Sequence, residues 1–266
     1  MPLLRWTNLL LSATLLLQAP LLHARLLRIE TIKSEPFGYD DARGKGGMMY
    51  EIGNLIASTA GIQYQNNVVP YARTVVSLRN GTADMVLRFG NEELTSVAHQ
   101  VTPVLALPTM IFSRAASHIL RFEDLQGATL ATARSFPIDP RIAADPAIHV
   151  YLTDSNEHSV RMLFAGRVDA VLGSDLGIYG AASRQSIKLS EFGMPIPLAP
   201  QHFWLHFSRK TADTATSVAL KNAVEKLERD GSINRIWKKY LDQAMLPATS
   251  LPALPAPTAS ILPVKR

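Results

Sequence analysis

The sequence contains no cysteine among its 266 residues. This absence excludes disulfide bonds, thiolate nucleophiles, iron–sulfur clusters and zinc sites built on cysteine, so a metal would need histidine and carboxylates alone. Basic residues exceed acidic ones only by 27 to 22, and they are scattered rather than gathered into a stripe. Nucleic-acid-binding proteins usually concentrate positive charge on one face, so we expect no nucleic-acid partner.

Motifs of catalysis and of cofactor binding are also scarce. The glycines of residues 44–47 lack both the spacing and the following Lys and Ser or Thr of a phosphate-binding loop. Ser174 stands in the second rather than the third place of a nucleophile-elbow motif. His202 and His206 fall on an expected strand, where roughly 13 Å would separate them, too far for one ion. We therefore expect no metal, no cofactor and no catalytic residue, and binding is the favoured class of function.

The two ends of the chain differ from the part between them. Residues 1–24 carry Arg5, an apolar run from Leu9 to Leu17 and a possible cleavage point after Ala24, which is the layout of a secretory signal peptide. An uncleaved membrane anchor is the alternative, but the apolar run is short for a bilayer-spanning helix. Residues 247–266 hold five prolines and predict a disordered tail, with a docking peptide as the alternative.

A pattern of five residues occurs twice in the remaining chain, at one constant offset. A stretch with helical periodicity precedes each copy, and a short apolar run that reads as a buried strand follows each glycine. The second helix is expected over residues 155–165, with Asp154 as its N-terminal cap. This repeat predicts two related α/β lobes. The matched residues are Leu78, Gly81, Asp84, Val86 and Leu87, and then Leu163, Gly166, Asp169, Val171 and Leu172.

Other segments fit the same plan of alternating strands and helices. We expect residues 25–112 and 206–246 to form one lobe and residues 113–205 to form the other. Such alternation gives mostly parallel sheets, whose ligands lie at the carboxyl ends of the strands, here in a cleft between the lobes. Further strands are expected over residues 26–32, 63–69, 106–113, 129–133 and 202–207, and helices over residues 50–60 and 71–80.

The order of several short motifs resembles the family 3 extracellular solute-binding proteins, the periplasmic receptors of polar amino-acid ABC transporters. The resemblance covers nearly all of residues 26–243 and implies a two-lobed, monomeric protein in the periplasm that closes on a small solute by a hinge motion. The motifs are Glu35–Tyr39, Gly81–Leu87, Val101–Pro103, Phe122–Gly127, Gly166–Asp175 and Asp230–Ile233, followed by Ile236 and Trp237.

The resemblance also implies ligand positions in the first lobe. Phe37 matches the aromatic residue that packs on the solute, and Tyr71 matches a second aromatic residue at the start of the following helix. Arg88, Phe89 and Asn91 fall at the strand end where family members hydrogen-bond their solute.

In the second lobe, three residues match family ligand positions. Arg134 and Ser135 lie on the turn whose hydroxyl and amide groups commonly hold a carboxylate at a helix start. Asp175 matches the acidic residue that pairs with the amino group of the solute, although it could instead cap the next helix. By contrast, Asp84 and Asp169 are expected to be structural.

The sequence departs from the family in one respect. Amino-acid receptors carry an arginine a few residues after the first-lobe strand end, where it grips the α-carboxylate, but residues 93–97 contain none. Ordinary amino-acid recognition is therefore in doubt, since a buried carboxylate needs a partner. Arg88 is positioned to replace that clamp, and Arg73 and Arg134 are further cations near the expected cleft.

We therefore expect a binding protein for a small polar, carboxylate-bearing solute, working with an ABC permease. One alternative is an enzyme similar to the periplasmic cyclohexadienyl dehydratases, with Glu35, Glu92 or Asp175 as its general acid. A second alternative is a ligand-sensing subunit for a membrane receptor.

Overall fold

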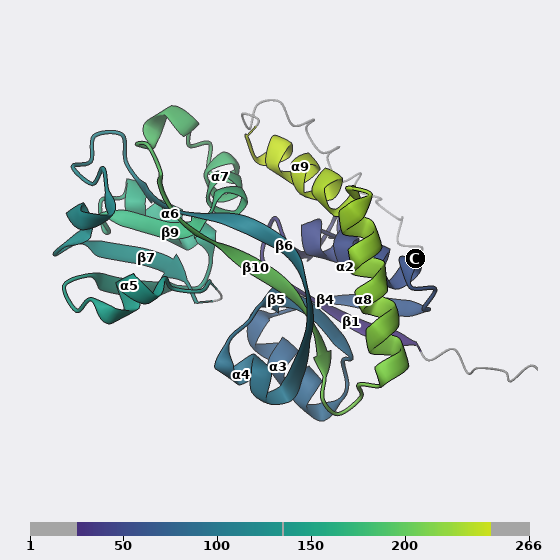
Figure 1. Ribbon diagram of the computed structural model, residues 1–266. Helices are drawn as coiled ribbons and strands as arrows, with labels where there is room; N and C mark the ends of the chain where they lie inside the picture. Colours follow the sequence, from purple (N-terminus) through teal and green to yellow (C-terminus); the bar gives the residue numbers. More distant parts are fainter. Residues whose placement is uncertain (1–25, 135, 246–266) are drawn as a thin grey trace, which may run out of the picture.

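The computed structural model describes residues 26–134 and 136–245, which form two α/β lobes joined through one eight-stranded sheet (Figure 1). The strand order is β4-β1-β5-β10-β6-β9-β7-β8. Two long antiparallel strands, β6 (Ala98–Ser113) and β10 (Ile196–Ser208), occupy the centre of this order and pass from one lobe to the other. This is the fold class that the sequence predicts. The leader, the tail and Ser135 lie outside the described residues.

The first lobe contains a parallel set of strands that β10 extends in the antiparallel sense. β1 pairs in parallel with β4 and β5, and β5 pairs with the C-terminal half of β10. Its elements are β1 (Leu27–Ile32), β2 (Tyr39–Asp41), β3 (Gly44–Gly46), α2 (Met48–Thr59), β4 (Tyr64–Val69), α3 (Tyr71–Asn80), β5 (Met85–Phe89), α4 (Glu92–Val97), α8 (Thr214–Arg229) and α9 (Ser232–Met245).

The second lobe repeats this plan on a smaller scale. β7 pairs in parallel with β8 and β9, and β9 pairs with the C-terminal part of β6. The limits of the two lobes stay a prediction, and both connections lie within β6 and β10. The elements are η1 (Phe122–Leu125), β7 (Thr129–Ala133), α5 (Pro140–Ala144), β8 (His149–Thr153), α6 (Asn156–Phe164), β9 (Ala170–Ser174), α7 (Asp175–Arg184) and η2 (Leu189–Glu191).

The repeated aspartates make the same backbone contact in both lobes. Asp84 precedes β5 and accepts from the N–H of Arg28 on β1 at 2.9 Å. Asp169 precedes β9 and accepts from the N–H of Thr129 on β7 at 2.8 Å. Each carboxylate therefore fixes the start of one parallel strand against its neighbour, and this supports the reading of two related lobes.

The repeated glycines also have the same conformation. Gly81 and Gly166 have φ values of +70° and +68°, and each follows a helix that ends there. In this left-handed region glycine carries no steric penalty from a Cβ atom. The expected cap of the second helix at Asp154 is wrong, because Ser155 Oγ accepts from the N–H of His158 at 3.2 Å instead.

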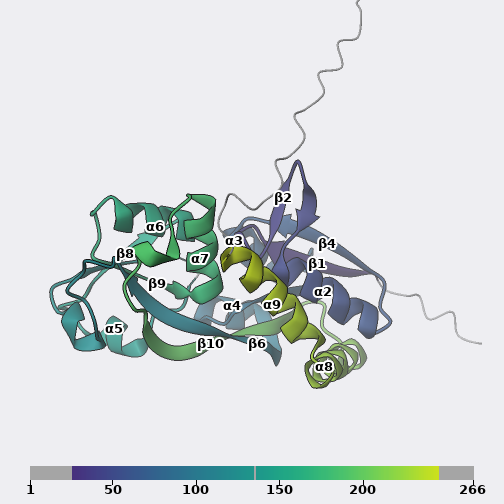
Figure 2. The same ribbon diagram turned by 90° about the horizontal axis from the view of Figure 1, so that it is seen from above.

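The last helix, α9, lies between the lobes at one side of the molecule. It packs against α7 of the second lobe as well as α2 and α8 of the first (Figure 2). Tyr240 donates from its hydroxyl to Glu51 of α2 at 2.6 Å, and Lys239 pairs with the same carboxylate at 2.8 Å. Within the described residues, no helix is both long and apolar enough to cross a membrane.

Candidate functional site

A small, largely apolar pocket lies between the two lobes. The first lobe contributes the ends of β1 and β5, the loop before β2 and the start of α2, while the second lobe contributes the end of β7 and the start of α6. The described lining residues are Ile32, Ser34, Phe37, Met49, Leu87, Arg88, Phe89, Ala133, Phe136, Asn156 and Phe203.

Four phenylalanines form a connected cluster in this pocket. Phe203 of β10 stands 4.1 Å from Phe89 and 5.4 Å from Phe37, measured between ring centroids. Phe136 of the second lobe contacts Phe89 edge-to-face at 5.2 Å. Since Phe89 and Phe136 belong to different lobes, the lobes touch through this pair. A solute in the pocket would meet aromatic faces on several sides.

Arg88 is the one cationic side chain among the described lining residues, and only 1% of it is exposed. Its Nη1 donates to Thr74 Oγ1 at 2.8 Å, and its guanidinium lies over the ring of Tyr71, 3.9 Å from the centroid. The buried Nε and Nη2 atoms have no hydrogen-bond partner in the described part of the chain. Burial lowers the pKa of Arg88, because the charged form loses its hydration.

Tyr71 and Asn91 are not among the described lining residues, but Tyr71 contacts Arg88 and Asn91 contacts Tyr71. The Asn91 amide donates to the Tyr71 hydroxyl at 3.1 Å, and its carbonyl oxygen accepts from the N–H of Leu94 as the cap of α4. The structure thus connects Arg88, Tyr71, Thr74 and Asn91 in one chain of contacts. Tyr71 holds the guanidinium in place from the side, and Asn91 holds Tyr71.

Arg134 directly follows the lining residue Ala133 in the second lobe but is not itself among the described lining residues. Its side chain is exposed and pairs with Asp154 at 3.2 Å. The neighbouring Ser135 lies outside the described residues, so its expected role stays a prediction. Phe136, the next residue along the chain, does line the pocket.

Asp175 is buried at the first turn of α7 and is not among the lining residues. Ser174, and not Asp175, caps this helix by accepting from the N–H of Gly177 at 3.1 Å. The Asp175 carboxylate accepts instead from the N–H of Leu176 at 2.6 Å. Burial raises the pKa of Asp175, since the charged form is disfavoured away from water.

Sequence reasoning missed several lining residues. Phe203 lies on the strand expected over residues 202–207, to which we assigned no ligand contact, and Phe136 lies in an irregular loop. Asn156 is 7% exposed at the start of α6, and a Cβ added to Gly177 would lie 2.7 Å from its Nδ2 atom. The absence of a side chain at Gly177 therefore makes room for Asn156, a signal visible only in three dimensions.

His206 lies on β10, where it is buried close to Arg88 of the neighbouring strand β5. Its Nδ1 atom lies 3.1 Å from the Trp204 carbonyl oxygen, while its Nε2 atom has no hydrogen-bond partner in the described part of the chain. Burial and then the charge of Arg88 lower the pKa of His206 to about 4. His202 and His206 share one strand, and the described residues contain no group of three or more potential metal ligands.

Comparison with known proteins decides the family. Residues 27–243 match the bacterial extracellular solute-binding proteins, family 3. The chain belongs to this family. A search of curated proteins found no match for this family 3 solute-binding protein.

Solved structures of similar shape are distant in sequence. An ancestral arginine-binding protein bound to arginine is 18% identical, with 82% of this chain and 99% of that chain covered and a TM-score of 0.67. The amino-acid ABC transporter substrate-binding protein AbpA from Streptococcus pneumoniae, bound to L-arginine, is 14% identical, with coverages of 84% and 97% and a TM-score of 0.67. The VFT2 domain of BvgS from Bordetella pertussis, as a double mutant, is 19% identical, with coverages of 81% and 93% and a TM-score of 0.69. These likenesses show the fold of the family 3 protein.

Proposed function

We propose that this family 3 solute-binding protein traps a small carboxylate-bearing solute with an apolar body between its lobes. The observation that carries this proposal is Arg88. Its guanidinium is almost fully buried beside an aromatic pocket, and two of its donor atoms have no partner in the described part of the chain. A buried cation without a counter-ion is costly, and a carboxylate could accept from both donors.

The remaining lining favours an apolar body for the solute. Phe37, Phe89, Phe136 and Phe203 supply aromatic faces, and Ser34 and Asn156 are the uncharged polar residues of the described lining. Burial of apolar surface contributes about 25 cal/mol for each Å² removed from water. An aromatic or branched carboxylate therefore fits the site better than a compact polar one.

The pocket offers no evident partner for the ammonium group of an amino acid. Asp175, which was expected in that role, accepts a hydrogen bond from the N–H of Leu176 in its own helix. No described lining residue carries a carboxyl group. An α-amino acid would bury its ammonium group there without a counter-charge. We therefore propose a carboxylate without an adjacent amino group.

Binding is favoured over catalysis by the same lining. Of the three general-acid candidates, Glu92 is exposed on α4, Asp175 is bound to its own helix, and Glu35 pairs with two arginines. An acid catalyst must reach the atom that it protonates, and the described pocket provides no carboxyl or imidazole group for this.

The route of the solute follows from the family. We propose that the leader directs export to the periplasm and is cleaved there, and that the monomeric protein hands its solute to an ABC permease. The two lobes, residues 25–112 with 206–246 and residues 113–205, would part to admit the solute and then close. Lobe closure removes water from the pocket, which strengthens the Arg88 contact.

A thermal-shift screen of matched pairs tests the proposal. Each carboxylate is measured beside its own amide, for example phenylacetate beside phenylacetamide. Each amino acid is measured beside the carboxylate that lacks its amino group, for example L-phenylalanine beside 3-phenylpropanoate. We expect stabilisation by carboxylates that lack an amino group and none by the amides. Equal shifts for acids and amides, or shifts confined to amino acids, would contradict the proposed solute class.

A further inference from the structure

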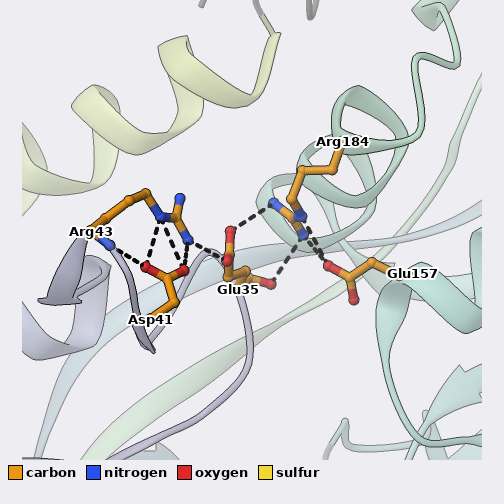
Figure 3. Close-up of polar contacts among 5 residues, drawn as sticks. All are labelled: Glu35, Asp41, Arg43, Glu157 and Arg184. Atoms are coloured by element: carbon orange, nitrogen blue, oxygen red, sulfur yellow. Dashed lines mark hydrogen bonds and ion pairs between the residues drawn. The ribbon is translucent and has the colours of Figure 1, made fainter. Parts of the chain in front are cut away.

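A row of five alternating charges crosses from the first lobe to the second (Figure 3). In the hairpin of β2 and β3, Arg43 pairs with Asp41 and donates to Glu35 Oε1 at 2.6 Å. The other carboxylate oxygen of Glu35 lies 3.9 Å from Nη1 of Arg184. Arg184 then donates from Nε to Glu157 Oε1 at 3.0 Å.

Arg184 makes the step between the lobes. It is the last residue of α7 and is anchored on its own lobe by Glu157 of α6. Across the gap it faces both the side chain and the main chain of Glu35, because its Nη2 atom also donates to the Glu35 carbonyl oxygen at 3.4 Å. One guanidinium thus holds two acidic residues of different lobes (Figure 3).

The segment that Arg184 holds is the one that carries Phe37 into the pocket. Phe37 follows Glu35 by two residues, and its carbonyl oxygen accepts from the N–H of Met49 at 2.9 Å. The Pro36 carbonyl oxygen accepts from the N–H of Met48 at 2.9 Å. Since the loop is fixed to α2 on one side, a contact from α7 on the other side positions the loop relative to the second lobe.

From these contacts we infer that Arg184 is a positioning residue for solute binding: it links the Glu35–Phe37 loop to the second lobe and favours the closed arrangement. This inference rests on the proposed binding of a solute between the lobes. The polar contacts of Arg184 in the described part of the chain go to Glu35 and Glu157, which do not line the pocket, so Arg184 acts through the loop. Its effect is therefore on the balance of open and closed forms and on the escape of the solute.

The side chains of Glu35, Glu157 and Arg184 are 29%, 28% and 30% exposed. Ion pairs of this kind are weaker than buried ones and are screened by salt. Arg184 shares its charge between two carboxylates, so its removal affects both contacts. We expect about a fivefold change in the ratio of closed to open forms, within the range of partly exposed pairs.

Interlobe distances in the protein without solute test this inference. The natural chain has no cysteine, so L120C on the second lobe and V218C on α8 of the first lobe give two unique sites for spin labels. Both native side chains are exposed, at 71% and 50%. Double electron–electron resonance then gives the populations of short and long distances at 50 mM and 500 mM NaCl.

We expect the short distance to dominate in the parent at low salt. In R184Q the ratio of the short-distance to the long-distance population should fall about fivefold. In E35Q, which keeps the carbonyl oxygen of residue 35, this ratio should fall less. R184K should recover part of the loss. K238Q is the matched control, because Lys238 pairs with Asp242 within α9. In the double variant E35Q/R184Q, the ratio of the short-distance to the long-distance population should fall by less than the two single effects combined.

An unchanged distribution in R184Q, an equal change in K238Q, or a parent that shows only the long distance at both salt concentrations would overturn the inference. Thermal unfolding of each variant shows whether it is folded. If R184Q does not fold, E35Q tests the same contact from the first lobe. Because no solute is present, a negative result here leaves the proposed solute class to be decided by its own screen.

Discussion

The guanidinium of Arg88 lies over the ring of Tyr71, with 3.9 Å between Cζ and the ring centroid. Thr74 fixes the same group through a 2.8 Å hydrogen bond, and Asn91 fixes Tyr71. The arginine is therefore held in one position while two of its donors have no partner in the described part of the chain. A group that is preorganised in this way loses little further conformational freedom when an anion binds.

Replacing Arg88 by methionine should have opposite effects on stability and on binding. The variant removes a buried charge whose Nε and Nη2 atoms have no hydrogen-bond partner in the described part of the chain, so we expect the free energy of unfolding without solute to rise by about 1–2 kcal/mol. Carboxylate binding should be lost at the same time. Denaturant unfolding and thermal-shift titration measure the two effects separately. A large loss of stability in R88M would show that Arg88 is mainly structural.

The repeated aspartates should differ in their contribution to stability. Asp84 is fully buried and also pairs with the Arg28 guanidinium at 2.8 Å, while Asp169 is exposed. We expect D84N to lower the free energy of unfolding by about 2–4 kcal/mol and D169N by less than ~1 kcal/mol. Urea unfolding of both variants checks this order, and equal losses would contradict it.

The edge-to-face contact of Phe89 and Phe136 should matter for affinity more than for folding. F136A removes an aromatic face of the pocket and the contact between lobes, so we expect affinity to fall about tenfold. F112A is the matched comparison, because Phe112 is fully buried in the second-lobe core. It should cost about 3–5 kcal/mol of stability. A greater loss of stability in F136A than in F112A would reverse the expected roles.

His206 should make the protein less stable in acid. Its pKa is about 4 in the folded protein against an ordinary 6.5, so between these pH values the unfolded chain binds more protons. The free energy of unfolding therefore falls as pH drops through this window, by at most about 3 kcal/mol.

H206N should flatten this part of the curve of stability against pH. The raised pKa values of Glu30 and Asp175 act in the opposite sense, but both groups are present in the two proteins, so the comparison isolates the histidine. Urea unfolding at pH 4.5, 5.5 and 7 measures the difference. Parallel curves for the two proteins would contradict the assigned cause.

Local patterns in the sequence predicted much of the fold. The helix over residues 71–80 and the strand over residues 129–133 have the predicted bounds, and the glycine and aspartate of each repeat have equivalent roles in both lobes. These features depend on a few neighbouring residues. β6 begins at Ala98, eight residues before the predicted strand, because it pairs with β10 across both lobes, a long-range partner that local patterns do not reveal.

The site was less predictable for the same reason. Phe37, Arg88 and Phe89 were expected in the cleft and line the pocket, and their role toward a solute stays a prediction. Phe203 joins them from a strand more than a hundred residues later, so its place depends on the pairing of β10 with β5. Arg134 was expected to face the cleft, but the parallel pairing of β7 with β8 brings it close to Asp154.

Isothermal titration calorimetry of Arg88 variants tests the central claim most directly. The carboxylate that gives the largest thermal shift is titrated into the natural protein and into R88M, with its amide as a parallel ligand. We predict that R88M weakens carboxylate binding by at least about 30-fold, equivalent to about 2 kcal/mol, and that it leaves the weak binding of the amide unchanged. Dissociation constants for the carboxylate that agree within about threefold between the two proteins would contradict the account.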